Sequence, residues 1–136
     1  LGDEYKGQVL SMHMQGKAPA FILAEYFGST TNDAGSGIFH MNSSKCAFGI
    51  EVVQMPKTTG TGYCKFRDAD GDTVNFRASS KGILGRSTDA NFTITNGTGK
   101  YKGITGTGLF KANNVPSFEQ GTFQALGTFG GSYKLP

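Results

Sequence analysis

The sequence predicts an all-β protein: a single antiparallel β-barrel of about eight strands with little or no helix. Hydrophobic and polar residues alternate with a period of two in segment after segment, which is the pattern of half-buried strands. Turn-forming residues separate these segments at short intervals, which leaves no room for the crossover helices of a parallel sheet. The chain of 136 residues, with 21 glycines, 11 phenylalanines and no tryptophan, is the size of one domain, spanning residues 1–136.

Alternation along the chain marks the expected strands. They are residues 9–14, 21–27, 38–41, 48–52, 63–67, 74–78, 92–94, 104–110, 121–129 and 133–135. In the second of them, Glu25 shares one face with Leu23 and Phe27, whereas Tyr26 shares the other face with Ala24. Because both faces carry apolar groups, alternation alone leaves open which face points into the barrel.

A glycine-rich stretch, residues 96–108, interrupts a background of strand-forming residues. Glycine within a strand pattern marks bulges and close backbone approaches, which a closed sheet requires. We therefore expect substitution of Gly99, Gly103 or Gly106 by valine to cost about 1 kcal/mol or more. A phosphate-binding loop is excluded, because Tyr101 stands where such a loop needs serine or threonine.

Residues 68–72, Asp-Ala-Asp-Gly-Asp, lie between two alternating segments. An Asp-Gly pair in this position favours a tight hairpin. A second interpretation is a weak cation site, since Asp68, Asp70 and Asp72 occupy the first three ligand positions of a calcium-binding loop. Thr73 and the flanking strands depart from that loop, so the hairpin is the preferred interpretation and no metal is expected.

The two cysteines, Cys46 and Cys64, lack the spacing of a redox or zinc motif. One disulfide between them is the simplest interpretation, and two buried thiols are the alternative. The chain begins at Leu1 rather than at methionine, from which we expect a mature form after removal of a signal peptide. A secreted or periplasmic location follows as an expectation.

These cysteines, the hairpin of residues 62–72 and the glycine-rich segment 97–106 together resemble a known group of proteins. They are small secreted proteobacterial proteins of unknown function, similar in turn to the calycin-like allene oxide cyclase and dirigent barrels. The resemblance covers roughly residues 37–110 and implies an eight-stranded antiparallel barrel with a signal peptide. The matched positions are turns, bulges and cysteines, so the resemblance assigns no catalytic residue.

Charge and motif content limit the classes of function. The net charge of +3 comes from singly scattered lysines and arginines, so nucleic-acid binding is not expected. No apolar run approaches the roughly 20 residues of a membrane span. His13 and His40 lie on separate segments without further ligands nearby, and two histidines among many serines define no catalytic triad. We expect no cofactor, and the residues favour a non-enzymatic role.

Glu25 is the leading candidate site residue, because an inward-facing carboxylate would be a polar anchor in an apolar cavity. Tyr26, His13, His40 and Glu51 are weaker candidates. The expected function is binding of a small apolar or aromatic ligand. The alternatives are a filled barrel that meets a protein partner, as a surface antigen does, and a cyclase or isomerase. A hollow interior would favour ligand binding or isomerisation over the filled barrel.

Overall fold

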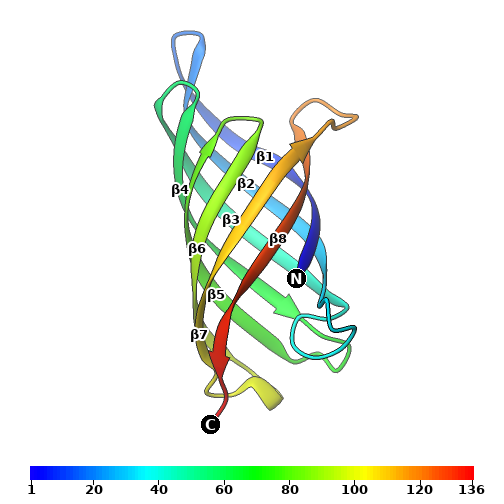
Figure 1. The fold of residues 1–136 in the computed structure, drawn as a ribbon. Coiled ribbons are helices and arrows are strands. Elements are labelled where there is room, and N and C mark those ends of the chain that lie inside the picture. The colour runs from blue at the N-terminus through cyan, green and yellow to red at the C-terminus, as the bar shows by residue number, and fades with distance from the viewer.

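A computed structural model describes all 136 residues and confirms a closed barrel of eight antiparallel strands (Figure 1). Each strand pairs with its neighbours in the sequence, and the last strand pairs with the first. The strands are β1 (Gly2–Gln15), β2 (Ala18–Thr31), β3 (Asn42–Gln54), β4 (Lys57–Arg67), β5 (Thr73–Ile83), β6 (Ser87–Gly97), β7 (Thr105–Val115) and β8 (Thr122–Lys134), and a short 3-10 helix, η1 (Gly99–Tyr101), precedes β7. No helix has the length and apolar character that crossing a membrane requires.

The two ends of the barrel are built differently (Figure 1). The hairpin end, uppermost in Figure 1, carries the turns that join β1 to β2, β3 to β4, β5 to β6 and β7 to β8. The terminal end carries the other three connections and both chain termini. The Leu1 ammonium group is paired there with Asp33, at 3.0 Å, in the connection between β2 and β3.

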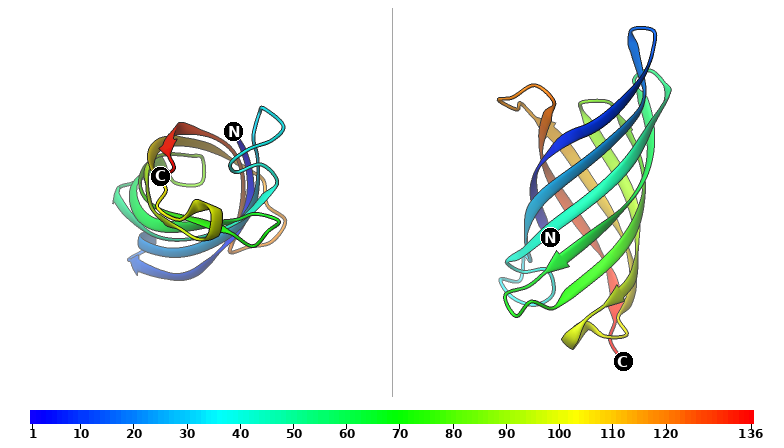
Figure 2. Two further views of the ribbon diagram at one scale, coloured as in Figure 1. Left: turned by 90° about the horizontal axis from the view of Figure 1, so that it is seen from below. Right: turned by 180° about the vertical axis from the view of Figure 1, so that it is seen from behind.

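The β1–β2 hairpin projects beyond the rest of the barrel at the hairpin end (Figure 2). β1 pairs with β8 only from Gly2 to Gln8, whereas its pairing with β2 continues to Gln15. A register shift between Val9 and Ser11 interrupts the β1–β2 ladder at the point where β1 leaves β8. Such bulges bend a strand and increase its twist, and this one lies where the hairpin departs from the closed sheet.

Apolar side chains fill the terminal half of the barrel. Five phenylalanine rings stack or meet edge to face, with centroids 4.7 to 6.3 Å apart: Phe39, Phe66, Phe76, Phe92 and Phe129. Val74, Ile94 and Ile104 belong to the same buried cluster. These are preferred aromatic geometries, and the cluster is the hydrophobic core of the protein.

The connection between β2 and β3 closes the terminal end, and it corrects one sequence prediction. Residues 38–41, expected as a strand, form a turn instead. Phe39 has a φ of 62° and is buried against Phe66 and Phe129. Its carbonyl oxygen accepts a buried hydrogen bond of 2.7 Å from the Thr30 hydroxyl. The apolar residues of this segment therefore close the end of the barrel and do not form a strand. We call this closure, centred on Phe39, the plug. Residues 133–135, expected as a separate strand, are the end of β8 and the residue after it.

The glycine-rich segment forms the turn after β6, η1 and the start of β7. Gly99 and Gly103 have φ values of +56° and +81°, which L side chains rarely adopt. Gly106 is extended, but a Cβ atom there would overlap the Ser132 carbonyl oxygen of β8. The glycines therefore serve a turn and a close strand approach, as the sequence indicated.

Cys46 on β3 and Cys64 on β4 are paired as a disulfide. They are directly opposite each other in the antiparallel ladder, with Cα atoms 4.1 Å apart. Both side chains point inward and belong to the buried core. The structure thus selects the disulfide over the alternative of two buried thiols.

Candidate ligand-binding cavity

The half of the barrel nearer the hairpin end is hollow. It encloses a cavity of about 410 Å³, which lies within the range of small-molecule binding sites, about 300 to 1,000 Å³. The turn between β5 and β6 contributes Leu84 and Gly85 to the lining, and the turn between β7 and β8 contributes Gly121. Because these residues lie at the hairpin end, the cavity reaches the surface there.

Aromatic rings from β1, β2, β3, β7 and β8 form the floor and lower wall of the cavity. Tyr5 and Tyr26 have ring centroids 4.6 Å apart, and Phe48 stacks on Tyr26 at 5.7 Å. Phe110 and Phe123 lie 6.2 and 6.3 Å from Tyr5. This layer, which we call the aromatic floor, lies between the hollow half of the barrel and the packed core.

The walls above the aromatic floor differ in polarity from one side of the barrel to the other. Strands β1 to β3 supply apolar side chains, namely Val9, Met12, Ile22, Ala24 and Ile50. Strands β4 to β8 supply hydroxyl and amide groups near the mouth, namely Thr58, Ser80, Ser87, Thr88, Asn114 and Thr122. An amphipathic ligand therefore meets apolar surface in depth and hydrogen-bonding groups along one side of the mouth.

A buried carboxyl group, Asp3, lies below the aromatic floor. Its side chain is inward-facing, only 8% of the residue is exposed, and its Oδ1 atom has no hydrogen-bond partner. Burial raises the pKa of Asp3 from its ordinary value of 3.8 to about 6, and the neighbouring Glu4 carboxylate adds to this shift. Asp3 is thus the residue most unlike an ordinary core position.

The two tyrosines of the floor are held in their neutral form. Burial raises the pKa of Tyr5 and of Tyr26 above the ordinary value of 10.0, and the nearby Asp3 carboxylate raises each further. Both phenols therefore keep their protons near neutral pH and offer hydrogen-bond donors to the interior.

Of the five candidate residues from the sequence, only Tyr26 lines the cavity. Glu25 lies on the outer face of β2, where its Oε1 atom accepts a hydrogen bond of 2.9 Å from Gln8 on β1. Glu51 and His13 are exposed on the outer side of β3 and β1, and both are paired with Phe21 in the ladder. The sequence left open which face of β2 points inward, and the structure places Glu25 outside, so the inward position that its role as an anchor required is not met.

His40 lies at the opposite end of the barrel from the cavity. Its Nδ1 atom accepts a hydrogen bond of 3.2 Å from the backbone N–H of Asn32, within the β2–β3 connection. This contact stabilises the turn that carries Phe39. The candidate residues consequently do not come together as one site.

Sequence reasoning missed Asp3, Tyr5 and the aromatic floor as a unit. The segment from Gly2 to Gln8 carries charged or polar residues between its inward positions, and its apolar alternation is weak. Asp3 does alternate in phase with Tyr5 and Gly7, and this period of two is the signal that places all three on one face. Their inward direction became clear only once the barrel was closed.

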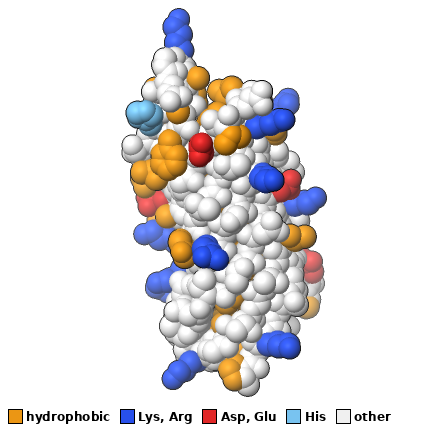
Figure 3. All heavy atoms as spheres, turned by 90° about the vertical axis from the view of Figure 1, so that its left-hand side faces the viewer, with side chains coloured by type: hydrophobic (Ala, Val, Ile, Leu, Met, Phe, Trp, Pro, Cys, Tyr) orange, Lys and Arg blue, Asp and Glu red, His pale blue; other side chains and the backbone are white.

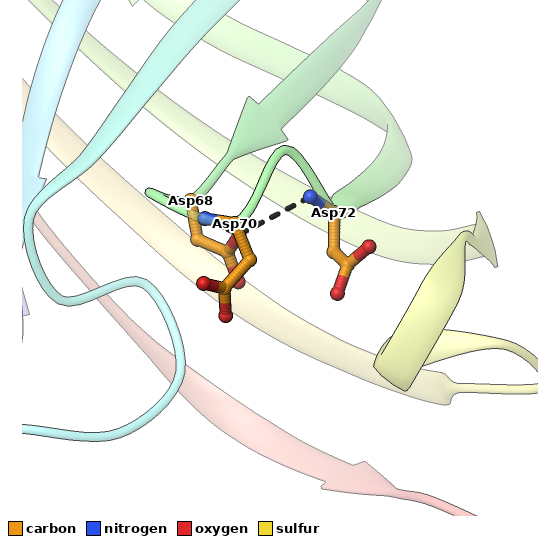
Figure 4. Close-up of side chains that lie close together, drawn as sticks. All are labelled: Asp68, Asp70 and Asp72. Carbon is orange, nitrogen blue, oxygen red and sulfur yellow. Dashed lines mark hydrogen bonds between the residues drawn. The ribbon is translucent and has the colours of Figure 1, made fainter.

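The acidic turn between β4 and β5 (Figure 4) is held by hydrogen bonds within the turn and by an ion pair with Lys100 of η1. Oxygens of Asp68, Asp70 and Asp72 lie within 4.8 Å of one another. Asp68 accepts hydrogen bonds from the backbone N–H groups of Asp70 and Asp72, at 2.9 and 3.2 Å. The Lys100 ammonium group pairs with Asp68 at 2.6 Å and with Asp70 at 2.7 Å, and it holds the pKa of Asp68 below its ordinary value. Lysine thus takes the place that a cation would need, and the hairpin interpretation accounts for the cluster.

Exposed apolar side chains gather on the outer surface toward the hairpin end (Figure 3). Leu10, Phe21 and Leu23 of the β1–β2 hairpin and Tyr63 of β4 are among them, each at least 42% exposed. Leu10, Leu23 and Tyr63 border a shallow groove over β2, β3 and β4. The outer surface of the β1–β2 hairpin and the adjoining strands is therefore partly apolar.

Comparison of the chain with protein families, curated proteins and solved structures finds no significant match. Function is accordingly argued from the geometry of the cavity.

Proposed function

We propose that this barrel binds a small apolar or aromatic molecule in the cavity at its hairpin end. The single observation that supports this most directly is the division of the interior. One half is packed with phenylalanine rings, whereas the other leaves about 410 Å³ unfilled above an aromatic floor. Natural interiors are close-packed with few voids larger than a water molecule, so a void of this size in a closed barrel is a feature that ligand binding explains.

The chemistry of the lining supports binding rather than catalysis. The cavity lining contains hydroxyl, amide and phenol groups but no histidine, lysine or carboxylate. Acid–base catalysis depends on a titratable group that can exchange a proton with the substrate. The titratable groups of this lining are the phenols of Tyr5 and Tyr26, and burial raises their pKa values, which holds them in the neutral form. The disulfide between Cys46 and Cys64 supports a further part of the proposal, that the protein works outside the cytoplasm, in an oxidising compartment.

Fluorescence titration with prodan, a neutral aromatic fluorophore, tests the proposal. We expect saturable binding of one prodan per barrel with a blue-shifted emission, because the fluorophore leaves water for an apolar cavity. Substitution of Thr88→Phe, which fills the cavity from β6, should weaken binding by about tenfold or more.

The matched control is Asn91→Phe, which adds the same ring to the outer face of the same strand. This variant should bind prodan as the parent does. If the two variants lower affinity equally, or if the parent binds no prodan, the interior cavity is not a ligand site and the interaction class of function gains support.

A further inference from the structure

The Asp3 carboxyl group gives the interior of the barrel a chemical preference that its apolar lining does not. The side chain leaves β1 toward the barrel axis, and its unpartnered Oδ1 atom is fully buried. Asp3 borders a second, small cavity of about 30 Å³ whose other lining residues are apolar or aromatic. Buried polar atoms nearly always have a hydrogen-bond partner, so this oxygen has acceptor capacity that the protein itself does not use.

The small cavity adjoins the large one through the aromatic floor. Tyr26, Phe48, Ala90 and Phe110 line both. The small cavity is about the volume of one water molecule. A single compact polar group on a ligand therefore fits beside Asp3, whereas a bulky headgroup does not.

The sign of the charge at this position limits the ligand class. No lysine, arginine or histidine lines either cavity, so the Asp3 carboxyl has no cationic partner inside the barrel. An anionic ligand would lose its hydration without gaining an opposite charge, which is costly in an apolar site. A cation would gain both the carboxylate and the negative faces of the Tyr5 and Tyr26 rings.

We propose that the ligand is an organic amine, whose apolar or aromatic body fills the large cavity and whose ammonium group is directed through the aromatic floor toward Asp3. This inference rests on the proposed function and deepens it by naming the ligand class. The ammonium supplies the donor that Oδ1 lacks, and the neighbouring rings add cation–π attraction. Fatty acids and other apolar anions are disfavoured by the same arrangement.

Three ligands of one ring system separate charge from shape: 1-naphthylmethylamine, 1-naphthalenemethanol and 1-naphthoate. Isothermal titration calorimetry at pH 7.5 should show the amine binding about tenfold or more tightly than the alcohol. The naphthoate should bind about tenfold more weakly than the alcohol, or not at all. Equal affinities for the three would overturn the amine preference while leaving the cavity as a ligand site. Failure of all three, and of prodan, would overturn the proposed function itself.

The variant Asp3→Asn tests whether Asp3 causes the preference for the amine, because it keeps the shape of the side chain and removes its charge. The variant should lose the preference for the amine and keep its affinity for 1-naphthalenemethanol. Glu4→Gln is the matched control, because it removes one negative charge from the adjacent, exposed position of β1 and should keep the preference. If Asp3→Asn still prefers the amine, Asp3 is not the anchor and the inference is wrong.

A measurement on the unsubstituted protein guards against a variant that does not fold. Carbon-detected NMR of the side-chain carboxyl groups should show the Asp3 resonance shifting when 1-naphthylmethylamine is added. The alcohol should leave it in place. An Asp3 resonance that responds to neither ligand, in a protein that binds both, would exclude contact between the ammonium and this carboxyl.

Discussion

At the scale of single residues, the orientation of one side chain decides whether a carboxyl group is an anchor or part of the surface. Asp3 lies on β1 and Glu25 lies on the neighbouring strand β2, yet their side chains face opposite sides of the sheet. Glu25 makes a hydrogen bond to Gln8 at the surface, whereas Asp3 is buried without a partner for Oδ1. Only the second arrangement couples a carboxyl group to the interior of the barrel.

The burial of Asp3 predicts a pH dependence of stability. Its pKa is about 6 in the folded protein and 3.8 when unperturbed, so between these values the folded state holds a proton that the unfolded state has released. The contribution of Asp3 to the free energy of unfolding is therefore greatest below pH 3.8. It falls by about 3 kcal/mol as the pH rises through 6. Asp3→Asn lacks this titration and should gain stability relative to the parent as the pH rises.

Urea unfolding of the parent and Asp3→Asn from pH 3 to pH 7.5 measures this difference directly, because the other titrating groups are common to both proteins. The stability of Glu4→Gln should follow that of the parent closely over this pH range. The only expected difference is a slightly smaller rise in the pKa of Asp3, because Glu4 contributes to that rise. A difference between parent and Asp3→Asn that stays constant over the whole range would mean that Asp3 is solvated.

At the scale of elements, the closure of the barrel depends on close contact between β7 and β8. Gly106 on β7 faces Tyr133 in the ladder, and a Cβ atom at Gly106 would overlap the backbone carbonyl of Ser132. Backbone cannot move aside as the end of a flexible side chain can. Gly130 on β8, by contrast, has no atom within 4 Å of the position where a Cβ would stand.

This contrast predicts different effects for the same substitution on adjacent strands. Gly106→Ala should lower the free energy of unfolding by about 2 kcal/mol, in the range of overpacking a close contact. Gly130→Ala should be neutral or slightly stabilising, since alanine restricts the unfolded chain without a clash in the folded one. Chemical denaturation of the two variants gives the comparison, and equal effects would contradict the close approach of β7 to β8.

At the scale of the whole molecule, the barrel divides into a part that provides stability and a part that is available for binding. The phenylalanine cluster, the plug at Phe39 and the disulfide all lie below the aromatic floor or within the core. The hollow half lacks such packing and relies on strand pairing. In this arrangement the packed core holds the strands around the cavity in place, and its side chains do not fill the cavity.

The disulfide should supply a measurable share of the stability of this core. Cys46 and Cys64 are separated by 18 residues in the sequence, and closing a loop of this size stabilises a fold by about 3 kcal/mol in the chain-entropy model. Reduction should therefore lower the denaturation midpoint of the parent. The double variant Cys46→Ala, Cys64→Ala should show no response to reductant. Two thiols that react with an alkylating agent under native, non-reducing conditions would contradict the disulfide.

The sequence by itself determined the class of fold, since strand periodicity and turn chemistry are local properties of the chain. The alternation of residues 63–67 and 74–78 around an Asp-Gly turn predicts the β4–β5 hairpin that the structure contains. The sequence likewise marked Gly99 and Gly103 as turn or bulge positions, and the structure shows a positive φ at both. The pairing of Cys46 with Cys64 could be predicted as the simplest option from the cysteine count.

Only the tertiary structure decided which face of each strand points inward. Leu23 and Ala24 are both apolar, and the closure of the barrel buries Ala24 while leaving Leu23 at the surface. That decision places Tyr26 in the cavity and Glu25 outside it, and it brings Asp3 beneath the aromatic floor. Burial is a property of contacts between strands distant in the sequence, so neither the cavity nor its buried carboxyl can be predicted from the period-two pattern of one strand.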